Sequence, residues 1–244
     1  MKLHEELSIL IPCKNDEEIL LEKIQTVIDF CELNIKDYEI LIVLNGSTKQ
    51  NKKLMNSFIS NNPNENINVI ESDKIGKGAA VKEGLNNALY ETVLISDADF
   101  SVSIDHFTKF LDNEGNLLSD FVVGSRKLYE SQNLETPLSR IITGLGYTFF
   151  VKILLGINIS DTQCGFKAIN KKNFTNHNTF LMDGFSYDVE LFLLAKKNKI
   201  STTEVPVQYI HNDDSNINIV WDPLKMAIEM VIIFFRYRVK GSIS

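Results

Sequence analysis

The stretch Val93-Leu94-Ile95-Ser96-Asp97-Ala98-Asp99 joins an apolar run to two aspartates that are one residue apart. A short apolar run bounded by polar residues predicts a buried β-strand. Side chains at positions i and i+2 of a strand leave the same face, so we expect Asp97 and Asp99 to point into one space at the strand's end. Neighbouring carboxylates repel each other unless a cation lies between them, and hard divalent ions prefer such oxygen ligands. The pattern fits a Mg2+ or Mn2+ site, and it fits a solvated turn after a strand equally well.

Strands and helices alternate on the N-terminal side of this stretch. Short apolar runs predict strands, whereas apolar residues three and four positions apart predict helices. The expected strands are at 7–12, 38–44 and 67–70, and the expected helices are at 17–31, near 54–59 and at 78–90. After about residue 100 we expect strands at 121–124 and 203–209 and helices at about 137–156 and 185–198. The sequence therefore predicts an α/β fold with a mostly parallel sheet, helices on both faces and ligands at the carboxyl ends of the strands.

The composition is that of an ordinary globular protein. The chain has 244 residues, of which 44% are hydrophobic and 23% charged, which favours a single domain over residues 1–244. A formal net charge of -7 argues against a nucleic-acid-binding protein, which usually carries a basic face. The three cysteines are widely spaced, which excludes the common zinc motifs and a disulfide framework. We expect a protein of the reducing cytoplasm.

Two apolar segments, Ile141 to Ile159 and Met226 to Arg238, come closest to membrane-active sequences. Neither reaches the ~18 apolar residues that a membrane-spanning helix needs. The N-terminus lacks the basic start and apolar core of a signal peptide. The two segments are consistent with amphipathic helices at a membrane surface, with buried core helices and with a contact in a homo-oligomer. Peripheral attachment to the cytoplasmic membrane face therefore stays open.

Three loops that follow predicted strands carry polar residues suited to ligand binding. Gly76, Lys77 and Gly78 combine close backbone approach, positive charge and free N–H groups at a helix start, which suits a phosphate. A turn that simply begins a helix explains the same residues. The loops at Asn15 and Asn45 should lie at the same sheet edge as Asp97, where they would form a pocket for a nucleobase.

An ordered series of motifs extends over the chain from about Ser8 to Arg238. The motifs are ILIPCKNDEE, VLNGST, KIGKGAAVKEGL, LISDADFS, VGSRK, DTQCGFKAI, FSYDVELFLLAKK and EVPVQYIH. Together they resemble the inverting glycosyltransferase family 2, which has a GT-A (Rossmann-like) fold. Within that family, they are most similar to the polyprenyl-phosphate (dolichyl-phosphate) glucosyltransferase and mannosyltransferase branch. The resemblance implies a nucleotide-sugar-binding half at about 1–100 and an acceptor-side half at about 101–244, with C-terminal amphipathic helices.

The resemblance also implies roles for individual residues. Asp97, Ala98 and Asp99 would form the family's DxD motif, with the two carboxylates holding Mg2+ or Mn2+ on the donor diphosphate. Nucleoside contacts would come from Pro12, Lys14, Asn15 and Glu17, and contacts near the ribose and phosphates from Gly76, Lys77 and Gly78. Arg126 and Arg140 would face a donor or acceptor phosphate. The sugar side would be closed by Asp161, Gln163, Asp188 and Glu190.

The chain departs from the family pattern at two positions. Leu44 and Asn45 stand where the family usually has two aspartates, so an acidic contact to the base or ribose is missing or replaced by Asn45. Asn216 stands where the branch usually has a lysine, so Lys77, Arg126 or Arg140 would have to supply that charge. The donor base therefore stays open among UDP, GDP and dTDP sugars.

The chemistry of the acceptor decides whether a general base is needed. A polyprenyl phosphate is already anionic at pH 7, because the second pKa of a phosphate monoester is about 6, and it can attack the anomeric carbon directly. A sugar hydroxyl needs a carboxylate base within hydrogen-bond reach, for which Asp161, Asp188 and Glu190 are candidates. We expect transfer of a hexose to polyprenyl phosphate. The alternatives are a saccharide acceptor of the cell envelope or capsule, and a nucleotide-sugar-binding protein without turnover.

Overall fold

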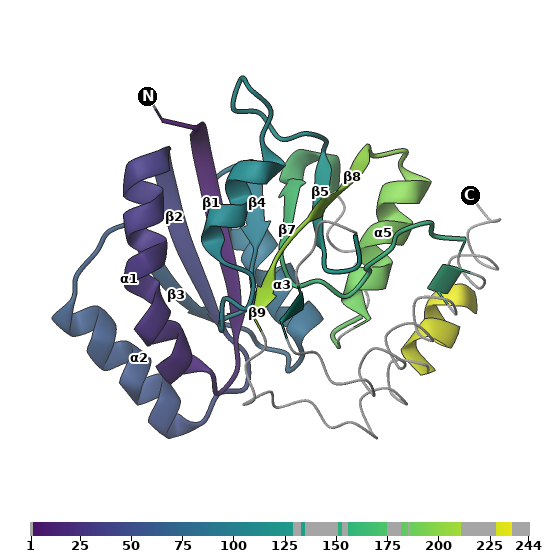
Figure 1. The fold of residues 1–244 in the computed structure, drawn as a ribbon. Helices are drawn as coiled ribbons and strands as arrows, with labels where there is room; N and C mark the ends of the chain where they lie inside the picture. Colours follow the sequence, from purple (N-terminus) through teal and green to yellow (C-terminus); the bar gives the residue numbers. More distant parts are fainter. Residues whose placement is uncertain are drawn as a thin grey trace.

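The computed structural model describes residues 2–128, 133–134, 151–152, 156–174, 182–184, 186–210 and 228–235. Seven of the described strands form one sheet in the order β3-β2-β1-β4-β7-β5-β8 (Figure 1). They are β1 (His4–Cys13), β2 (Ile35–Leu44), β3 (Ile67–Glu71), β4 (Thr92–Ile95), β5 (Phe121–Ser125), β7 (Lys167–Asn170) and β8 (Thr202–Pro206). The short strands β6 (Asn133–Leu134) and β9 (Tyr209–Ile210) pair separately.

The described helices lie on both sides of this sheet. They are α1 (Glu17–Asn34), α2 (Lys49–Asn61), α3 (Lys77–Asn87), α5 (Tyr187–Lys197), the 3-10 helices η1 (Ile104–Phe110) and η2 (Lys171–Phe174), and an unlabelled helix at 228–235. Buried side chains of α1, α2 and η1 share one apolar cluster, and those of α3, α5 and 228–235 share a second. Figure 1 shows α1 and α2 at the β1–β3 end and α5 at the β5–β8 end.

The strands divide their apolar side chains between these two clusters. Ile9 and Ile11 of β1 and Leu94 of β4 belong to the first, whereas Leu10 of β1 and Ile95 of β4 belong to the second. Because successive residues of a strand face opposite sides, a strand that is covered on both sides must be apolar throughout. The continuous apolar runs in the sequence are explained by this burial.

The fold prediction is confirmed, with local corrections. The sheet is mostly parallel, but β7 runs antiparallel to both β4 and β5. β4 ends at Ile95, two residues before Asp97, so the two aspartates lie beyond the strand instead of on one of its faces. The helix at 228–235 falls within the apolar segment predicted at its position, while most of the segments 137–156 and 141–159 lies outside the described residues.

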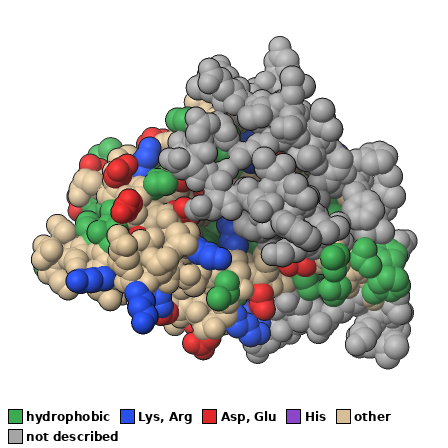
Figure 2. All heavy atoms as spheres, turned by 90° about the horizontal axis from the view of Figure 1, so that it is seen from below, with side chains coloured by type: hydrophobic (Ala, Val, Ile, Leu, Met, Phe, Trp, Pro, Cys, Tyr) green, Lys and Arg blue, Asp and Glu red, His purple; other side chains and the backbone are tan. Residues whose placement is uncertain are grey.

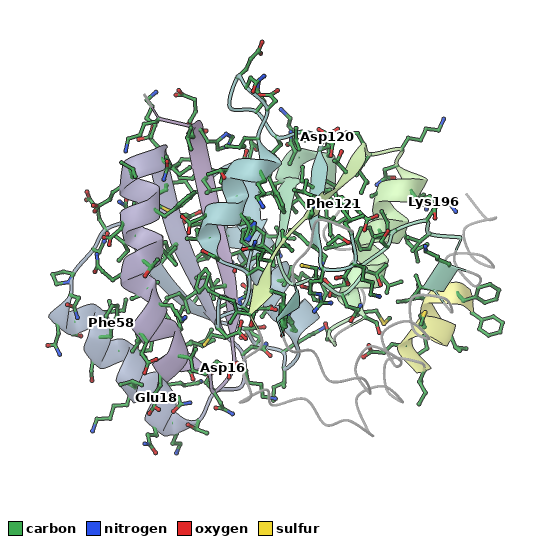
Figure 3. The ribbon with its side chains drawn as sticks, viewed as in Figure 1. Asp16, Glu18, Phe58, Asp120, Phe121 and Lys196 are labelled. Atoms are coloured by element: carbon green, nitrogen blue, oxygen red, sulfur yellow. The ribbon has the colours of Figure 1, made fainter. Side chains whose placement is uncertain are left out.

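The loops of interest meet at the carboxyl edge of the parallel strands, which is the lower edge in Figure 1. The loops after β1, β2, β4 and β5 leave from this edge. Since β7 is antiparallel, its first residue, Lys167, starts there as well. Figure 3 shows the side chain of Asp16, just after β1, at this lower edge and that of Asp120, just before β5, at the opposite edge. The topology therefore gathers residues from distant parts of the sequence in one place.

Candidate active site

The loops after β1 and β2 are tied together at this edge. Asn15 has a left-handed backbone (φ 63°), and its Oδ1 accepts a hydrogen bond from the N–H of Thr48 at 3.0 Å. Pro12 lies within β1, whereas Lys14 and Asn15 are exposed. Of the residues predicted to contact a nucleoside, these three therefore line the start of one loop.

Glu17 is the buried member of the same group. Its side chain is inaccessible to solvent at the first residue of α1, and its Oε2 accepts a hydrogen bond from Asn51 Nδ2 at 2.8 Å. The other carboxylate oxygen, Oε1, is buried without a hydrogen-bond partner on the protein. A buried oxygen that lacks a partner is energetically costly, so Oε1 is suited to accept a hydrogen bond from a ligand.

Asn45 holds the loop that leads into α3. Its Nδ2 donates to the carbonyl of Lys74 at 2.6 Å, and its Oδ1 accepts from the N–H of Gly76 at 2.6 Å. A carboxylate at this position could accept one of these bonds but could not donate the other. Asn45 and the neighbouring Leu44 are each only 2% exposed. Both Nδ2 and Oδ1 of Asn45 are thus hydrogen-bonded within the chain, whereas the sequence suggested that this side chain contacts the donor base.

The glycine-rich loop packs backbone to backbone against residues 182–184. Gly76 has φ 139°, and a Cβ atom there would lie far closer than 3.0 Å to the carbonyl oxygen of Asp183. The N–H groups of Gly78 and Ala79 donate to the carbonyls of Gly184 at 3.2 Å and Asp183 at 3.1 Å. The expectation that this helix start offers free N–H groups to a phosphate is therefore wrong for these two groups, because another segment of the chain already accepts their hydrogen bonds.

Asp97 and Asp99 lie in a tight turn after β4. The N–H of Phe100 donates to the carbonyl of Asp97 at 3.1 Å, which closes the turn. The carboxylate of Asp99 accepts from both the N–H and the hydroxyl of Ser101. Ala98 points its methyl group into the hydrophobic core, so only its backbone could meet a ligand. Both aspartates remain partly exposed.

Lys77 is the counter-ion of this turn. Its Nζ lies 2.5 Å from Asp97 Oδ1. Burial alone would lower the pKa of this lysine, but the carboxylates of Asp97, Asp188 and Asp99 outweigh it and hold the pKa above its ordinary value. Burial would likewise raise the pKa of Asp97, and the ammonium group of Lys77 reverses that shift. Lys77 and Asp97 are therefore both charged at neutral pH.

Arg126 and Asp161 form a bidentate ion pair beside the turn. Arg126 Nε donates to Asp161 Oδ2 at 2.7 Å, and Nη2 donates to Oδ1 at 3.0 Å. The backbone N–H groups of Arg126 and Gln163 also donate to this carboxylate. Burial would raise the pKa of Asp161, but Arg126 lowers it to about 2. Because its oxygens accept all these hydrogen bonds, the Asp161 carboxylate is better suited to holding Arg126 in place than to accepting a proton.

Two residues that the sequence reasoning missed support this pair. The carboxylate of Glu204 in β8 accepts from the backbone N–H of Asp161 at 3.1 Å. The guanidinium of Arg126 lies over the ring of Tyr209, 5.3 Å from its centre, within cation–π range. Glu204 is partly buried in β8, whose sequence TTEVP gives no local signal that singles this residue out.

The remaining candidate bases are also engaged. Asp188 Oδ1 lies 2.8 Å from Nζ of Lys167, a lysine with no solvent exposure. Glu190 Oε2 accepts from the N–H of Met182 at 2.9 Å. Lys167 was not predicted as a site residue, although a lysine between Phe166 and Ala168 in a strand is a recognisable anomaly.

Asp97 also meets a glycine in the turn just before β7, the strand next to β4. A Cβ atom at Gly165 would lie far closer than 3.0 Å to either carboxylate oxygen of Asp97. The structure thus brings together Lys77, Asp97, Asp99, Arg126, Asp161 and Asp188, while Arg140 lies outside the described residues. Among the described residues, no group of three or more His, Cys, Asp or Glu side chains is arranged to hold a metal ion.

Comparison with known sequences connects this site to an enzyme family. The profile described as Glycosyl transferase family 2 matches residues 8–177. A dolichyl-phosphate beta-glucosyltransferase of Dictyostelium discoideum is 32% identical over 95% of this chain and 74% of its own length. The Homo sapiens protein of the same name is 27% identical over 95% of this chain and 76% of its own length.

Solved structures agree on the fold. A glucosyl-3-phosphoglycerate synthase of Mycobacterium tuberculosis, solved with Mn2+ and UDP-glucose, superposes with a TM-score of 0.65 at 13% identity, over 94% of this chain and 78% of that one. Mannosyl-3-phosphoglycerate synthase of Rubrobacter xylanophilus gives 0.67 at 15% identity, over 98% and 76%. The fold is that of the GT-A glycosyltransferases, as expected.

Proposed function

The chain belongs to glycosyl transferase family 2 and is a glycosyltransferase, and we propose that it moves a hexose, glucose in the first instance, from a nucleotide diphosphate sugar to a polyprenyl phosphate. The relatives named above are described as dolichyl-phosphate beta-glucosyltransferases, which supports both the sugar and the acceptor. The two halves, about 1–100 and about 101–244, would act as one domain, since their described strands share one sheet.

The state of the three candidate bases carries the proposal. Asp161 is paired with Arg126, Asp188 with Lys167, and Glu190 accepts from a backbone N–H. A saccharide hydroxyl would need one of these carboxylates to take up its proton. A phosphate acceptor has no proton to lose at neutral pH and needs cations that orient it instead. Among the described residues, Lys77 and Arg126 offer that charge beside Asp97.

The residues of the turn fit a divalent metal ion. Asp97 and Asp99 offer carboxylate oxygens, the chemistry that Mg2+ and Mn2+ prefer, and a cation, the Lys77 ammonium, already lies against Asp97. A metal ion bound there would offset the charge that develops on the leaving diphosphate. Because two carboxylates are few ligands, phosphate oxygens of the donor would have to complete the set.

The proposed reaction is a single displacement. An oxygen of the acceptor phosphate forms a bond to the anomeric carbon, and the bond from that carbon to the donor diphosphate breaks. The nucleoside diphosphate leaves with the electron pair, so no proton transfer is needed. Attack from the side opposite the leaving group inverts the configuration at the anomeric carbon. Lys77 and Arg126 would orient the two phosphates in this step.

We also propose a peripheral membrane contact through the helix at 228–235. Met230 and Ile233 are buried against the core, whereas Ile228, Val231, Ile232 and Phe235 form an exposed apolar stripe at helical spacing. Figure 2, which looks onto the carboxyl edge, shows a hydrophobic patch at the end of the molecule where this helix lies. Within the described part of the chain, no helix combines the length and apolar character needed to cross a bilayer. An apolar stripe beside the site would bring it to a lipid-borne phosphate.

The test is a transfer assay with purified protein and labelled UDP-, GDP- and dTDP-glucose. Each donor is offered with Mn2+ and either dolichyl phosphate in detergent or soluble oligosaccharides. We expect label in the lipid fraction, loss of transfer with a chelator, and loss in Asp99→Asn but not in the matched control Asp105→Asn, an exposed aspartate in η1. Label only in saccharide would refute the acceptor. Donor binding without any transfer would indicate a binding protein.

A further inference from the structure

Lys167 is a buried cation for which the proposed reaction gives no direct use. It is the first residue of β7 and has no solvent exposure. Its ammonium group donates to Asp188 Oδ1 at 2.8 Å and to the backbone carbonyl of Cys164. Placing an ammonium group inside a protein costs several kcal/mol unless its partners compensate. The groups to which Lys167 is bonded should therefore explain why a lysine is buried at this position.

The turn at 164–166 is what Lys167 holds on one side. The bond to the Cys164 carbonyl spans this turn from within, and the N–H of Gly124 in β5 donates to the carbonyl of Phe166 at 2.9 Å from the outside. The turn is therefore fixed at both ends. Its middle residue, Gly165, lies directly against the Asp97 carboxylate, with no room for a Cβ atom.

The other partner of Lys167 is a buried carboxylate, that of Asp188 in α5. Asp188 is the second residue of α5, its Oδ1 lies 2.8 Å from Nζ of Lys167, and the residue is only 4% exposed. Lys167 thus joins the turn at 164–166, which lies against Asp97, to the first turn of α5.

We propose that Lys167 is a positioning residue for the donor site: it fixes the turn whose Gly165 backs the Asp97 carboxylate, and it neutralises Asp188. This inference rests on the proposed function, because that function makes Asp97 a residue that binds the donor. Lys167 itself touches no substrate. Lys167 thereby keeps the Asp97 carboxylate in place. Lys77, which is partly exposed, can leave Asp97 and pair with a phosphate instead.

The first variant pair separates this role from that of a simple buried ion pair. Lys167→Met alone leaves Asp188 buried without its counter-ion and should be strongly destabilised. The double variant Lys167→Met/Asp188→Asn removes both charges, so its thermal stability should return toward that of the wild type. The single variant Asp188→Asn keeps the bond from Lys167 to the Cys164 carbonyl but leaves the buried ammonium group without its counter-ion, so it should be destabilised as well. The matched control is Lys171→Met, which removes a lysine that donates to the Ala88 carbonyl away from the site.

The readout is binding of UDP-glucose with Mn2+ by calorimetry, together with the Mn2+ concentration that half-saturates transfer. We expect both values to rise about tenfold in the double variant, while the KM for the acceptor changes less than threefold. Lys171→Met should stay within about threefold of wild type in both. Wild-type donor affinity in a stable double variant would overturn the inference and leave Lys167 as a structural ion pair.

A second variant reaches the same turn without changing a charge. Gly165→Ala places a methyl group against the Asp97 carboxylate and should weaken donor binding by about tenfold at a nearly unchanged acceptor KM. Unchanged donor binding in a folded Gly165→Ala protein would equally overturn the inference. If the wild type binds the donor but transfers nothing, the proposed function fails, and the binding measurements still decide the role of Lys167.

Discussion

Replacing Asp161 by Asn removes one charge from the buried pair with Arg126 and leaves the side-chain size unchanged. Asp161 is 1% exposed and Arg126 28% exposed, so solvent screens the interaction only weakly. The pKa of its carboxyl group is about 2, against an ordinary value of 3.8. At about 1.36 kcal/mol per pKa unit this gap corresponds to ~2.5 kcal/mol of stability. An asparagine also turns its N–H groups toward a guanidinium that only donates, and breaking a buried pair costs about 3–5 kcal/mol.

We therefore expect Asp161→Asn to lower the free energy of unfolding by about 3 kcal/mol at pH 7. For a chain of this length that corresponds to a fall in Tm of roughly 6–12 °C. A carboxylate whose folded pKa is depressed stabilises fully above its unfolded pKa, and this contribution is lost as the pH falls through the folded pKa. The gap between wild type and variant should thus be constant above about pH 5 and shrink between pH 4 and pH 2.

Urea denaturation followed by circular dichroism at pH 7, 5 and 3 measures this gap. Asp73→Asn, an exposed aspartate, is the matched control and should differ from wild type by less than ~0.5 kcal/mol. A gap below ~0.5 kcal/mol for Asp161→Asn at pH 7, or one that is the same at pH 3 as at pH 7, would refute the assignment of Asp161 as the buried partner of Arg126.

Two further predictions concern the loop that leads into α3. Gly76→Ala forces a Cβ atom against the Asp183 carbonyl at φ 139°, so we expect a Tm at least 5 °C lower. Gly156→Ala also places an alanine at a positive φ, 64°, but its Cβ meets only a flexible lysine Nζ at 2.9 Å, so it should cost much less. Equal effects in melting curves of the two variants would contradict this. Asn45→Asp loses the donor to the Lys74 carbonyl and should cost about 1–3 kcal/mol while weakening donor binding. Calorimetry and urea denaturation test it, and tighter donor binding in the aspartate variant would show that Asn45 instead limits a contact with the base.

Much of the fold was predictable because the relevant signals are local. A strand covered on both faces is apolar throughout, and a helix with one covered face repeats its apolar residues every three to four positions. Strands β1, β2 and β4 and helices α1 to α3 follow these rules, and these elements and the half-exposed β3 were predicted within a few residues. The edge of the sheet that carries the loops follows from the alternation itself.

The candidate site was only partly predictable, because its contacts join residues far apart in the sequence. Asp97 and Asp99 were found from their spacing, but the turn that holds them depends on Ser101 and on Gly165, in the turn before the neighbouring strand β7. No pattern in the nearby sequence indicated that the N–H groups at the start of α3 donate to the carbonyls of residues 183 and 184. That pairing exists only after the chain has folded.

By itself, the sequence determined the α/β architecture, the sheet edge with its loops and the two aspartates, since backbone periodicity and residue chemistry act over a few positions. Only the tertiary structure decided which charged side chains pair with each other. Arg126 finds Asp161 at a distance of 35 residues, and Lys167 finds Asp188 at 21, on different elements. A buried charge must be paired, and the partner is whichever group the fold brings within about 3 Å. That selection engages all three candidate bases, Asp161, Asp188 and Glu190, in contacts within the protein.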